Sequence, residues 1–260
     1  MTEVETRQHD GVLGRIRSRS AGAPRAGVPE VILVHGMTAC DYLLPSLAAM
    51  SGWTRAHLID LPGCGGSGDP PHELSVAEFA AALGDWLDRH GPGRVILAGH
   101  SSGTQVATAT APSRDDVAAV VLGSPVFDPA WRTLPGVLTR WALDLTREPS
   151  GLERVNRRER KRAGLRRLRH VLHEHRGYDL TSAVAALPVP TLVVRGREDA
   201  LSTRRWTRRL ATLAAAGSHV DVPGPHTFCW PDPRAWSEPV REFALSLGTR
   251  RGQSHPLRRR

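Results

Sequence analysis

A short apolar run, a serine between glycines and a helix-forming segment follow one another near the middle of the chain. Residues 95–98 (Val-Ile-Leu-Ala) have the composition of a buried strand, and residues 99–103 (Gly-His-Ser-Ser-Gly) follow as a G-x-S-x-G pattern. Residues 104–111 then predict a helix. The sharp turn between strand and helix forces Ser101 into a cramped backbone conformation, and the flanking glycines avoid collisions with neighbouring chain. This stretch therefore predicts an α/β unit that raises the Ser101 hydroxyl above a strand end as a candidate nucleophile.

Further apolar runs predict the other strands of a sheet. These runs cover residues 31–34, 58–60, 117–122, 190–196 and 219–222. Asp199 and His226 each come shortly after one of the last two runs. Because active sites of open parallel sheets lie at the carboxyl ends of their strands, we expect Ser101, Asp199 and His226 to meet at one edge.

These three residue types suit nucleophilic catalysis. A serine hydroxyl needs a base to take its proton, and a histidine with an ordinary pKa near 6.5 can accept that proton and return it. A carboxylate behind the histidine fixes its tautomer and stabilises the imidazolium. We expect His226 to be the base rather than His35 or His100, because neighbouring side chains at a sharp turn point apart and His35 lies in a loop where its backbone matters more.

The acid has competing candidates. Asp199 follows a strand that ends in glycine, and it precedes His226 in the chain order Ser, Asp, His. Glu198 is its neighbour, and Asp128 follows the preceding strand after a short loop. We expect Asp199 to be the acid, with Asp128 as the alternative.

Backbone N–H groups beside the serine predict an oxyanion hole. The strand at residues 31–34 ends at His35-Gly36, so the chain can aim the N–H of Met37 into the cleft. The N–H of Ser102 is the second expected donor.

The glycine-rich residues 61–68 lack the Lys-Ser/Thr ending of a P-loop, so we expect no phosphate site there. Asp60 is expected to organise that loop.

These motifs together resemble the α/β-hydrolase superfamily. The matching pieces are Val34-His-Gly36, Asp60-Leu-Pro-Gly63 with Ser67, Gly99-His-Ser-Ser-Gly103, Gly196-Arg-Glu-Asp199 and Gly224-Pro-His226. They span residues 31–226 in the family's order. Cys64 stands where a histidine is common, and a second serine follows the nucleophile. The resemblance implies a doubly wound, mostly parallel sheet flanked by helices, with a Ser-Asp-His triad. Serine at position 101 argues against the branches that use aspartate there.

The resemblance also implies an activity. We expect a serine hydrolase that cleaves an ester, thioester or related carbonyl substrate through an acyl-enzyme on Ser101, with no metal or organic cofactor. The same constellation serves carbon–carbon bond hydrolysis and cofactor-free perhydrolysis, and a non-catalytic ligand-binding protein on the same fold is a further alternative.

Composition limits the other possibilities. A chain of 260 residues fits one α/β domain, and three scattered cysteines favour reduced thiols. No signal-peptide core and no apolar run of about 18 residues is present, so we expect a cytoplasmic protein without a membrane span. The net charge is +9, and much of the excess lies in residues 154–169 and in the last three arginines. No nucleic-acid-reading motif accompanies it, so we expect small acyl substrates rather than nucleic acid.

The segment between the sixth and seventh strands predicts a helical cap. Residues 129–187 form this cap segment, residues 1–128 and 188–248 form the core, and residues 249–260 form a basic, disordered tail. Within the cap segment we expect an apolar stripe to pack onto the core, with part of it roofing an apolar substrate pocket as the alternative: Trp131, Leu134, Leu138, Trp141 and Leu145. The arginine-rich residues 154–169 are expected to form a solvated helix face, with an anionic-substrate gate as the alternative, and His170, His173, Glu174 and His175 are not spaced as metal ligands.

The sequence also predicts helices and a strand in the first 90 residues of the core. Residues 74–90 predict a helix in which Ser75 and Glu78 form a capping box. Residues 41–50 predict another, with Asp41 as the cap at its start. Residues 10–20 predict one early edge strand.

Overall fold

A mostly parallel sheet forms the centre of the molecule. The computed structural model describes residues 3–253, and its sheet has the strand order β1-β2-β4-β3-β5-β6-β7-β8. The strands are β1 (Glu5–Gly11), β2 (Gly14–Ala21), β3 (Glu30–Val34), β4 (Ala56–Asp60), β5 (Val95–His100), β6 (Val117–Gly123), β7 (Thr191–Gly196) and β8 (Gly217–Val222). Only β2 runs antiparallel to its neighbours β1 and β4. The predicted fold class is confirmed.

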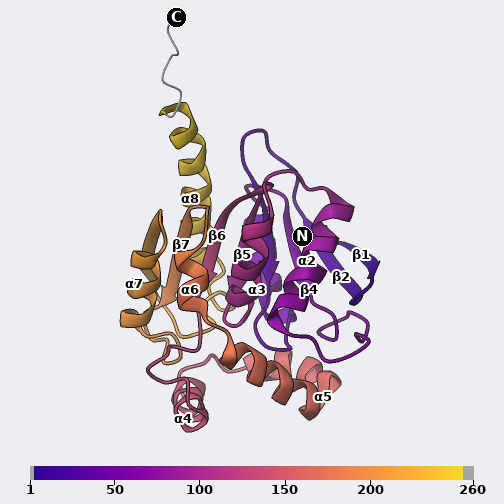
Figure 1. The fold of residues 1–260 in the computed structure, drawn as a ribbon, viewed down its shortest axis with the longest axis vertical. Helices are drawn as coiled ribbons and strands as arrows, with labels where there is room; N and C mark the ends of the chain where they lie inside the picture. The colour runs from indigo at the N-terminus through magenta and orange to yellow at the C-terminus, as the bar shows by residue number, and fades with distance from the viewer. Residues whose placement is uncertain (1–2, 254–260) are drawn as a thin grey trace, which may run out of the picture.

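Helices cover both faces of this sheet (Figure 1). On one face lie α2 (Val76–His90), α3 (Gly103–Thr110), α6 (Leu180–Ala185) and α7 (Arg204–Leu213). On the other lie α1 (Leu44–Met50) and α8 (Arg234–Gln253). Successive residues of β3 are buried alternately in two apolar clusters, one for each face. Burial on both faces explains why the central strands are continuous apolar runs rather than alternating ones.

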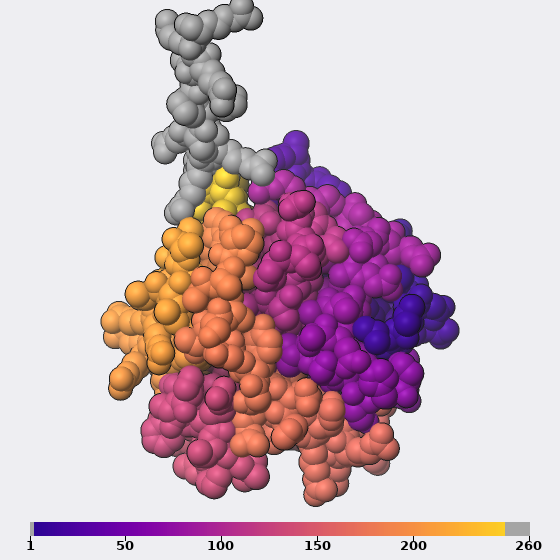
Figure 2. Space-filling model, viewed as in Figure 1, coloured from indigo at the N-terminus to yellow at the C-terminus, as the bar shows by residue number. Residues whose placement is uncertain are grey.

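Most of the cap segment lies at one end of the sheet, and only its last helix, α6, lies among the helices that cover the faces (Figure 1; Figure 2). It contains α4 (Leu134–Leu145), α5 (Leu152–Gly177) and α6. Helix α5 is interrupted at Gly164, where the backbone has φ 78° and ψ 162°. The chain between β6 and β7 is therefore helical, as the sequence predicts.

The first strands differ from the prediction of a single edge strand, because β1 and β2 pair as a hairpin. Strand β1 is mostly exposed and polar, so it has no alternation of apolar residues to reveal it. The capping box at the start of α2 is present, with the Ser75 hydroxyl accepting from the Glu78 N–H. The predicted helix at residues 41–50 begins as a short 3-10 turn (η1, Asp41–Leu43) that leads into α1.

The predicted Asp41 cap is wrong. Asp41 makes no side-chain capping bond; instead, Glu159 of α5 accepts from the N–H groups of Cys40, at 2.7 Å, and Asp41, at 3.1 Å. Asp41 binds Arg19. A carboxylate from a distant helix satisfies the free N–H groups, so the cap could not be found from local sequence.

The predicted apolar stripe is also wrong in part. Leu134, Leu138 and Leu145 are 46–56 % exposed, whereas Val137 and Asp144 are the buried positions of α4. Asp144 is turned inward because its carboxylate accepts from the Ala200 N–H at 3.1 Å. A polar residue therefore fixes the rotation of this helix against its hydrophobic pattern.

The end of the chain differs from the expected tail. Helix α8 continues to Gln253, beyond the predicted core boundary at residue 248, and residues 254–260 lie outside the described part. Each added helical residue gains a backbone hydrogen bond, and no proline interrupts the sequence between Pro239 and Pro256.

Candidate active site

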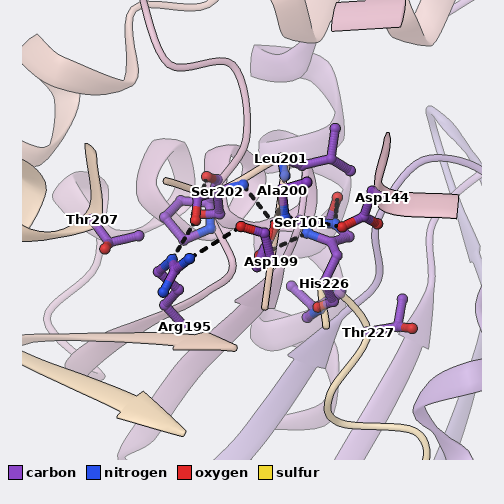
Figure 3. Close-up of polar contacts among 12 residues, drawn as sticks. Ser101, Asp144, Arg195, Asp199, Ala200, Leu201, Ser202, Thr207, His226 and Thr227 are labelled. Carbon is purple, nitrogen blue, oxygen red and sulfur yellow. Dashed lines mark hydrogen bonds and ion pairs between the residues drawn. The ribbon is translucent and has the colours of Figure 1, made fainter. Parts of the chain in front are cut away.

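The structure brings Ser101, Asp199 and His226 together at the carboxyl ends of three strands. They follow β5, β7 and β8 respectively. Ser101 Oγ lies 3.0 Å from His226 Nε2, and His226 Nδ1 lies 3.0 Å from Asp199 Oδ2. All three residues are at least nine-tenths buried, and Figure 3 shows them grouped together. This arrangement fits a ring whose Nδ1–H donates to Asp199 and whose Nε2 accepts from the Ser101 hydroxyl.

Close backbone contacts hold the serine in its turn. Ser101 has a positive φ of 55°, and its N–H donates to the Gly123 carbonyl of β6 at 2.8 Å. A Cβ on Gly99 would lie 2.4 Å from the Gly103 carbonyl oxygen, and a Cβ on Gly103 would lie 2.4 Å from the Val34 oxygen. Both obstacles are backbone atoms, so neither glycine can be replaced without moving a strand.

We predict that Gly103→Ala lowers the free energy of unfolding by about 3 kcal/mol, because the new methyl group overpacks against β3. Gly84→Ala is the matched control: its Cβ would meet only Arg114 Nη1, at 3.7 Å, inside helix α2. It should raise the free energy of unfolding by about 0.5–1 kcal/mol. Urea denaturation measures both, and equal stability of the Gly103 variant and the parent would contradict the packing argument.

Asp199 is fixed by its own backbone surroundings. Its Oδ1 accepts from the N–H groups of Leu201, at 2.8 Å, and Ser202, at 2.7 Å. Burial opposes ionisation, but the charge and hydrogen bond of His226 outweigh it, so the pKa of Asp199 is lowered. The alternative acid, Asp128, accepts instead from the Ala130 N–H and the Thr203 hydroxyl. Of the two, Asp199 is the one in contact with the ring.

The two other candidate histidines have different partners. His35 Nε2 accepts from the Leu61 N–H at 3.2 Å. His100 lies 2.9 Å from the Tyr42 hydroxyl through Nδ1, and its Nε2 donates to the His226 carbonyl at 3.0 Å. Burial, and then the nearby His226 charge, lower the pKa of His100 to about 3. A neutral His100 thus supports the backbone of His226 rather than contacting Ser101.

Tyr42 was not found by sequence reasoning. Its hydroxyl accepts from the Gly36 N–H at 2.8 Å and meets His100 on its other side. The hydroxyl therefore joins the loop after β3 to the residue before the serine. No local pattern marks it, because the three residues are distant in sequence.

The two residues expected to supply the oxyanion donors are in contact. The Met37 N–H donates to the Ser102 hydroxyl at 2.7 Å, and Met37 has a positive φ of 45°. Ser102 stands at the N-terminal end of α3, where the helix dipole favours negative charge.

Two carboxylates of the cap segment reach the loops next to Asp199 and His226, and no local sequence pattern marks them. Asp144 binds the Ala200 N–H (Figure 3). Glu148 accepts from the Thr227 N–H at 2.9 Å, directly after His226, and also contacts the Thr227 hydroxyl. Burial opposes protonation of His226, but Asp199 and then these two carboxylates outweigh it and raise the pKa of His226 to about 9. Burial raises the pKa of Asp144 to about 7, because the opposing charge of His226 is offset by the negative charges of Asp199 and Glu148.

A largely apolar cavity opens above Ser101 and beneath the cap segment. Its floor includes Met37, Ser101 and His226. Its apolar walls are Val126, Phe127, Trp131, Val137, Trp141, Leu172 and Leu201. Two members of the predicted stripe, Trp131 and Trp141, therefore line this cavity.

The arginine-rich part of α5 is only partly a solvated face. Arg162 donates to the carbonyls of Gly65 and Ser67, and Arg167 donates to the carbonyl of Gly63 at 2.9 Å. These contacts fasten the helix to the glycine-rich loop after β4. The expectation of a wholly solvated face is wrong for these residues, because their guanidinium groups satisfy loop carbonyls.

The histidines of α5 also have protein partners. His170 Nε2 donates to the Leu74 carbonyl at 3.0 Å, and His175 Nδ1 donates to Gln105 Oε1 at 2.6 Å. Within residues 3–253 no group of histidine, cysteine and acidic side chains is arranged to hold a metal ion.

No helix within residues 3–253 is both long and apolar enough to cross a bilayer. Cys40, Cys64 and Cys229 are buried free thiols.

Comparison with known proteins decides the family. The sequence profile described as "Alpha/beta hydrolase family" matches residues 31–244. The chain belongs to this family. Its relatives include the pimeloyl-[acyl-carrier protein] methyl ester esterase of Vibrio campbellii, 28 % identical over 83 % of this chain and 94 % of the relative. The same esterase of Vibrio cholerae is 36 % identical over 42 % of this chain, and that match spans only 44 % of the relative.

Solved structures agree on the α/β-hydrolase fold. A thermophilic esterase from Thermogutta terrifontis superposes with a TM-score of 0.71 at 20 % identity, covering 95 % of this chain and 99 % of the other. The chain therefore belongs to a family of enzymes, and a relative that it matches over nearly the whole length is an esterase.

Proposed function

We propose that this α/β hydrolase is a serine esterase that forms an acyl-enzyme on Ser101. The observation that carries the proposal is a pair of contacts, each 3.0 Å long. One joins Ser101 Oγ to His226 Nε2, and the other joins His226 Nδ1 to Asp199 Oδ2. Nucleophile, base and orienting acid are within hydrogen-bond reach without any movement. The esterase relatives support the same class of reaction.

The reaction follows from the positions of these groups. As Ser101 Oγ attacks the ester carbonyl carbon, its proton passes to His226 Nε2, and Asp199 stabilises the imidazolium. The imidazolium then protonates the alcohol as the carbon–oxygen bond breaks, which leaves an acyl group on Ser101. A water molecule, deprotonated by His226, attacks the acyl carbon, and the acid leaves as Ser101 regains its proton.

The negative oxygen of each tetrahedral intermediate is proposed to accept from the N–H groups of Met37 and Ser102. In the free protein the Ser102 hydroxyl is the acceptor for Met37. The substrate oxygen takes over this N–H when it binds. One such donor contributes about 3 kcal/mol of transition-state stabilisation.

The substrate we propose is a small carboxylic ester or thioester whose acyl part lies in the apolar cavity. Residues 129–187 then act as the cap that covers it, with Trp131 and Trp141 in its walls. No cofactor is needed for this chemistry.

A panel of p-nitrophenyl esters, methyl esters and thioesters of increasing chain length tests the proposal, with release of the acid measured directly. We expect turnover of at least one ester series, with kcat/KM depending on acyl length. Absence of hydrolysis across esters and thioesters, with folded protein, would overturn the proposed function.

The charges around His226 predict a pH dependence. Only the neutral ring can accept the proton, so kcat/KM should rise with pH through an apparent pKa of about 9. Because the pKa is raised on folding, the ionised ring also stabilises the fold fully below about pH 6.5, and this contribution is lost as pH rises through 9.

We predict that Asp144→Asn moves this limb of the pH profile to lower pH, because it removes a negative charge that favours the imidazolium. The rate at pH 7 should rise several-fold. Asp88→Asn, which removes a charge of a 71 % exposed side chain paired with Arg114, is the matched control and should leave the profile in place. Overlapping profiles for the Asp144 variant and the parent would contradict the assignment.

A further inference from the structure

The loop that carries Asp199 is held by one buried arginine. This acid loop, residues 197–203, joins β7 to α7 and contains no helix or strand, so its carbonyls need donors from elsewhere. Arg195, near the end of β7, donates through Nε to the Ser202 carbonyl at 2.6 Å. Its Nη2 donates to the carbonyls of Arg197 and Asp199, each at 3.1 Å. A single side chain therefore binds the start, the middle and the end of the loop (Figure 3).

The guanidinium of Arg195 is itself fixed in place. The residue is only 8 % exposed, and its Nη1 lies 3.3 Å from Asp221 Oδ1. Arg195 and Asp221 are direct neighbours across the paired strands β7 and β8. All three nitrogens of the group thus have a partner. Because a buried cation is costly unless it is paired and hydrogen-bonded, Arg195 is strongly held against the loop.

The bonds of Arg195 continue to the carboxylate of the acid. Ser202 gives its carbonyl to Arg195 and its N–H, at 2.7 Å, to Asp199 Oδ1, which also accepts from the Leu201 N–H at 2.8 Å. With Oδ1 held in this way, Oδ2 is directed at His226 Nδ1, 3.0 Å away. The backbone that Arg195 binds is therefore the backbone that orients the carboxylate.

Two arginines of the cap segment bind other carbonyls of the acid loop. Arg147 donates to the Glu198 carbonyl at 2.7 Å, in an exposed contact, and Arg140 donates to the Ala200 carbonyl at 3.3 Å. Both contacts approach the loop from the cap, whereas Arg195 approaches it from the sheet. The cap arginines thus leave the carbonyls that Arg195 binds without a substitute donor.

We propose that Arg195 is a positioning residue for the catalytic acid: it holds the acid loop so that Asp199 Oδ2 faces His226 Nδ1. This inference rests on the proposed esterase function. Arg195 is not among the residues that line the cavity above Ser101, so its effect on the reaction passes through Asp199 rather than through the substrate.

Kinetics of Arg195→Met test this role with p-nitrophenyl esters. We expect kcat about a hundredfold lower, as a small misplacement of a catalytic group gives, with KM within about twofold of the parent. The rising limb of the pH profile should move to lower pH, because the charge of Asp199 no longer lies against the ring. Arg204→Gln is the matched control: Arg204 binds the other oxygen of Asp221 and is 60 % exposed, so kcat and the profile should stay unchanged.

A double-mutant cycle separates positioning from a general structural role. In the Asp199→Asn protein, Arg195→Met should lower kcat by less than about threefold further, because the carboxylate that the arginine positions is already gone. A hundredfold loss in both backgrounds would overturn the proposal. An unchanged kcat and an unmoved pH profile in folded Arg195→Met would overturn it as well.

Proton NMR gives a readout that does not depend on turnover. The His226 Nδ1–H that donates to a carboxylate should give a low-field resonance in the parent and in Arg204→Gln, and this resonance should be lost in Arg195→Met. Its persistence would overturn the positioning role even if esters are hydrolysed. If the resonance depends on Arg195 but no ester reacts, the esterase function alone fails.

A conservative variant covers the case in which Arg195→Met does not fold at 25 °C. Arg195→Lys keeps a cation beside Asp221 but offers its donors from one atom, so it cannot reach all the carbonyls that the guanidinium binds. It should change kcat and the pH profile in the same directions, with a loss of about tenfold. Unfolding of both variants would show that the arginine serves the fold rather than the acid, and would overturn the proposal.

Discussion

Ser101→Ala is expected to lower kcat for an activated ester by at least about ten-thousandfold. The variant loses one atom, the Oγ that lies 3.0 Å from His226 Nε2, and no other described hydroxyl contacts that nitrogen. The Cβ and the backbone remain, so the turn between β5 and α3 should be kept and Tm should change by less than about 2 °C. Release of p-nitrophenol from p-nitrophenyl esters measures kcat, and a circular-dichroism melt measures Tm.

The control for this prediction is Ser113→Ala, a serine in the 3-10 turn after α3 whose hydroxyl only meets the Thr110 carbonyl. It should retain the parental rate. If Ser101→Ala kept more than about one hundredth of the activity, covalent catalysis by this serine would be ruled out.

Asp199→Asn is expected to lower kcat by about ten-thousandfold, because an amide in place of the carboxylate can donate to Nδ1 and stabilise the wrong tautomer of the ring. It also removes the charge that helps to raise the pKa of His226. The pH profile measured on the residual activity should therefore show its rising limb at lower pH than that of the parent protein.

Asp128→Asn is the matched comparison, since Asp128 was the alternative acid in the sequence. Its carboxylate bonds to Ala130 and Thr203, so its loss should change kcat less than about tenfold. A larger loss for the Asp128 variant than for the Asp199 variant would reverse the assignment.

The parts of the fold that depend on local pattern could be predicted. The apolar runs of β3, β5, β6 and β7 indicate strands buried on both faces, and the capping box of α2 uses residues three apart. Ser101, Asp199 and His226 come shortly after the ends of β5, β7 and β8. Their convergence is a property of the parallel sheet rather than of any one segment.

The rest depends on contacts between residues distant in sequence. Glu159 caps a helical turn more than a hundred residues earlier, and Tyr42 joins Gly36 to His100. Asp144 turns α4 so that its leucines face outward, against the hydrophobic pattern. Such polar contacts are specific in three dimensions and leave no periodic signal in the sequence.

Labelling with a fluorophosphonate followed by peptide mass spectrometry shows whether Ser101 is an activated nucleophile, because this reagent phosphonylates a serine only where a base activates it. We expect one adduct in the folded protein, on Ser101, and none on the Ser101→Ala variant. An adduct on another residue, or an unlabelled Ser101 in folded protein, would rule out Ser101 as the nucleophile.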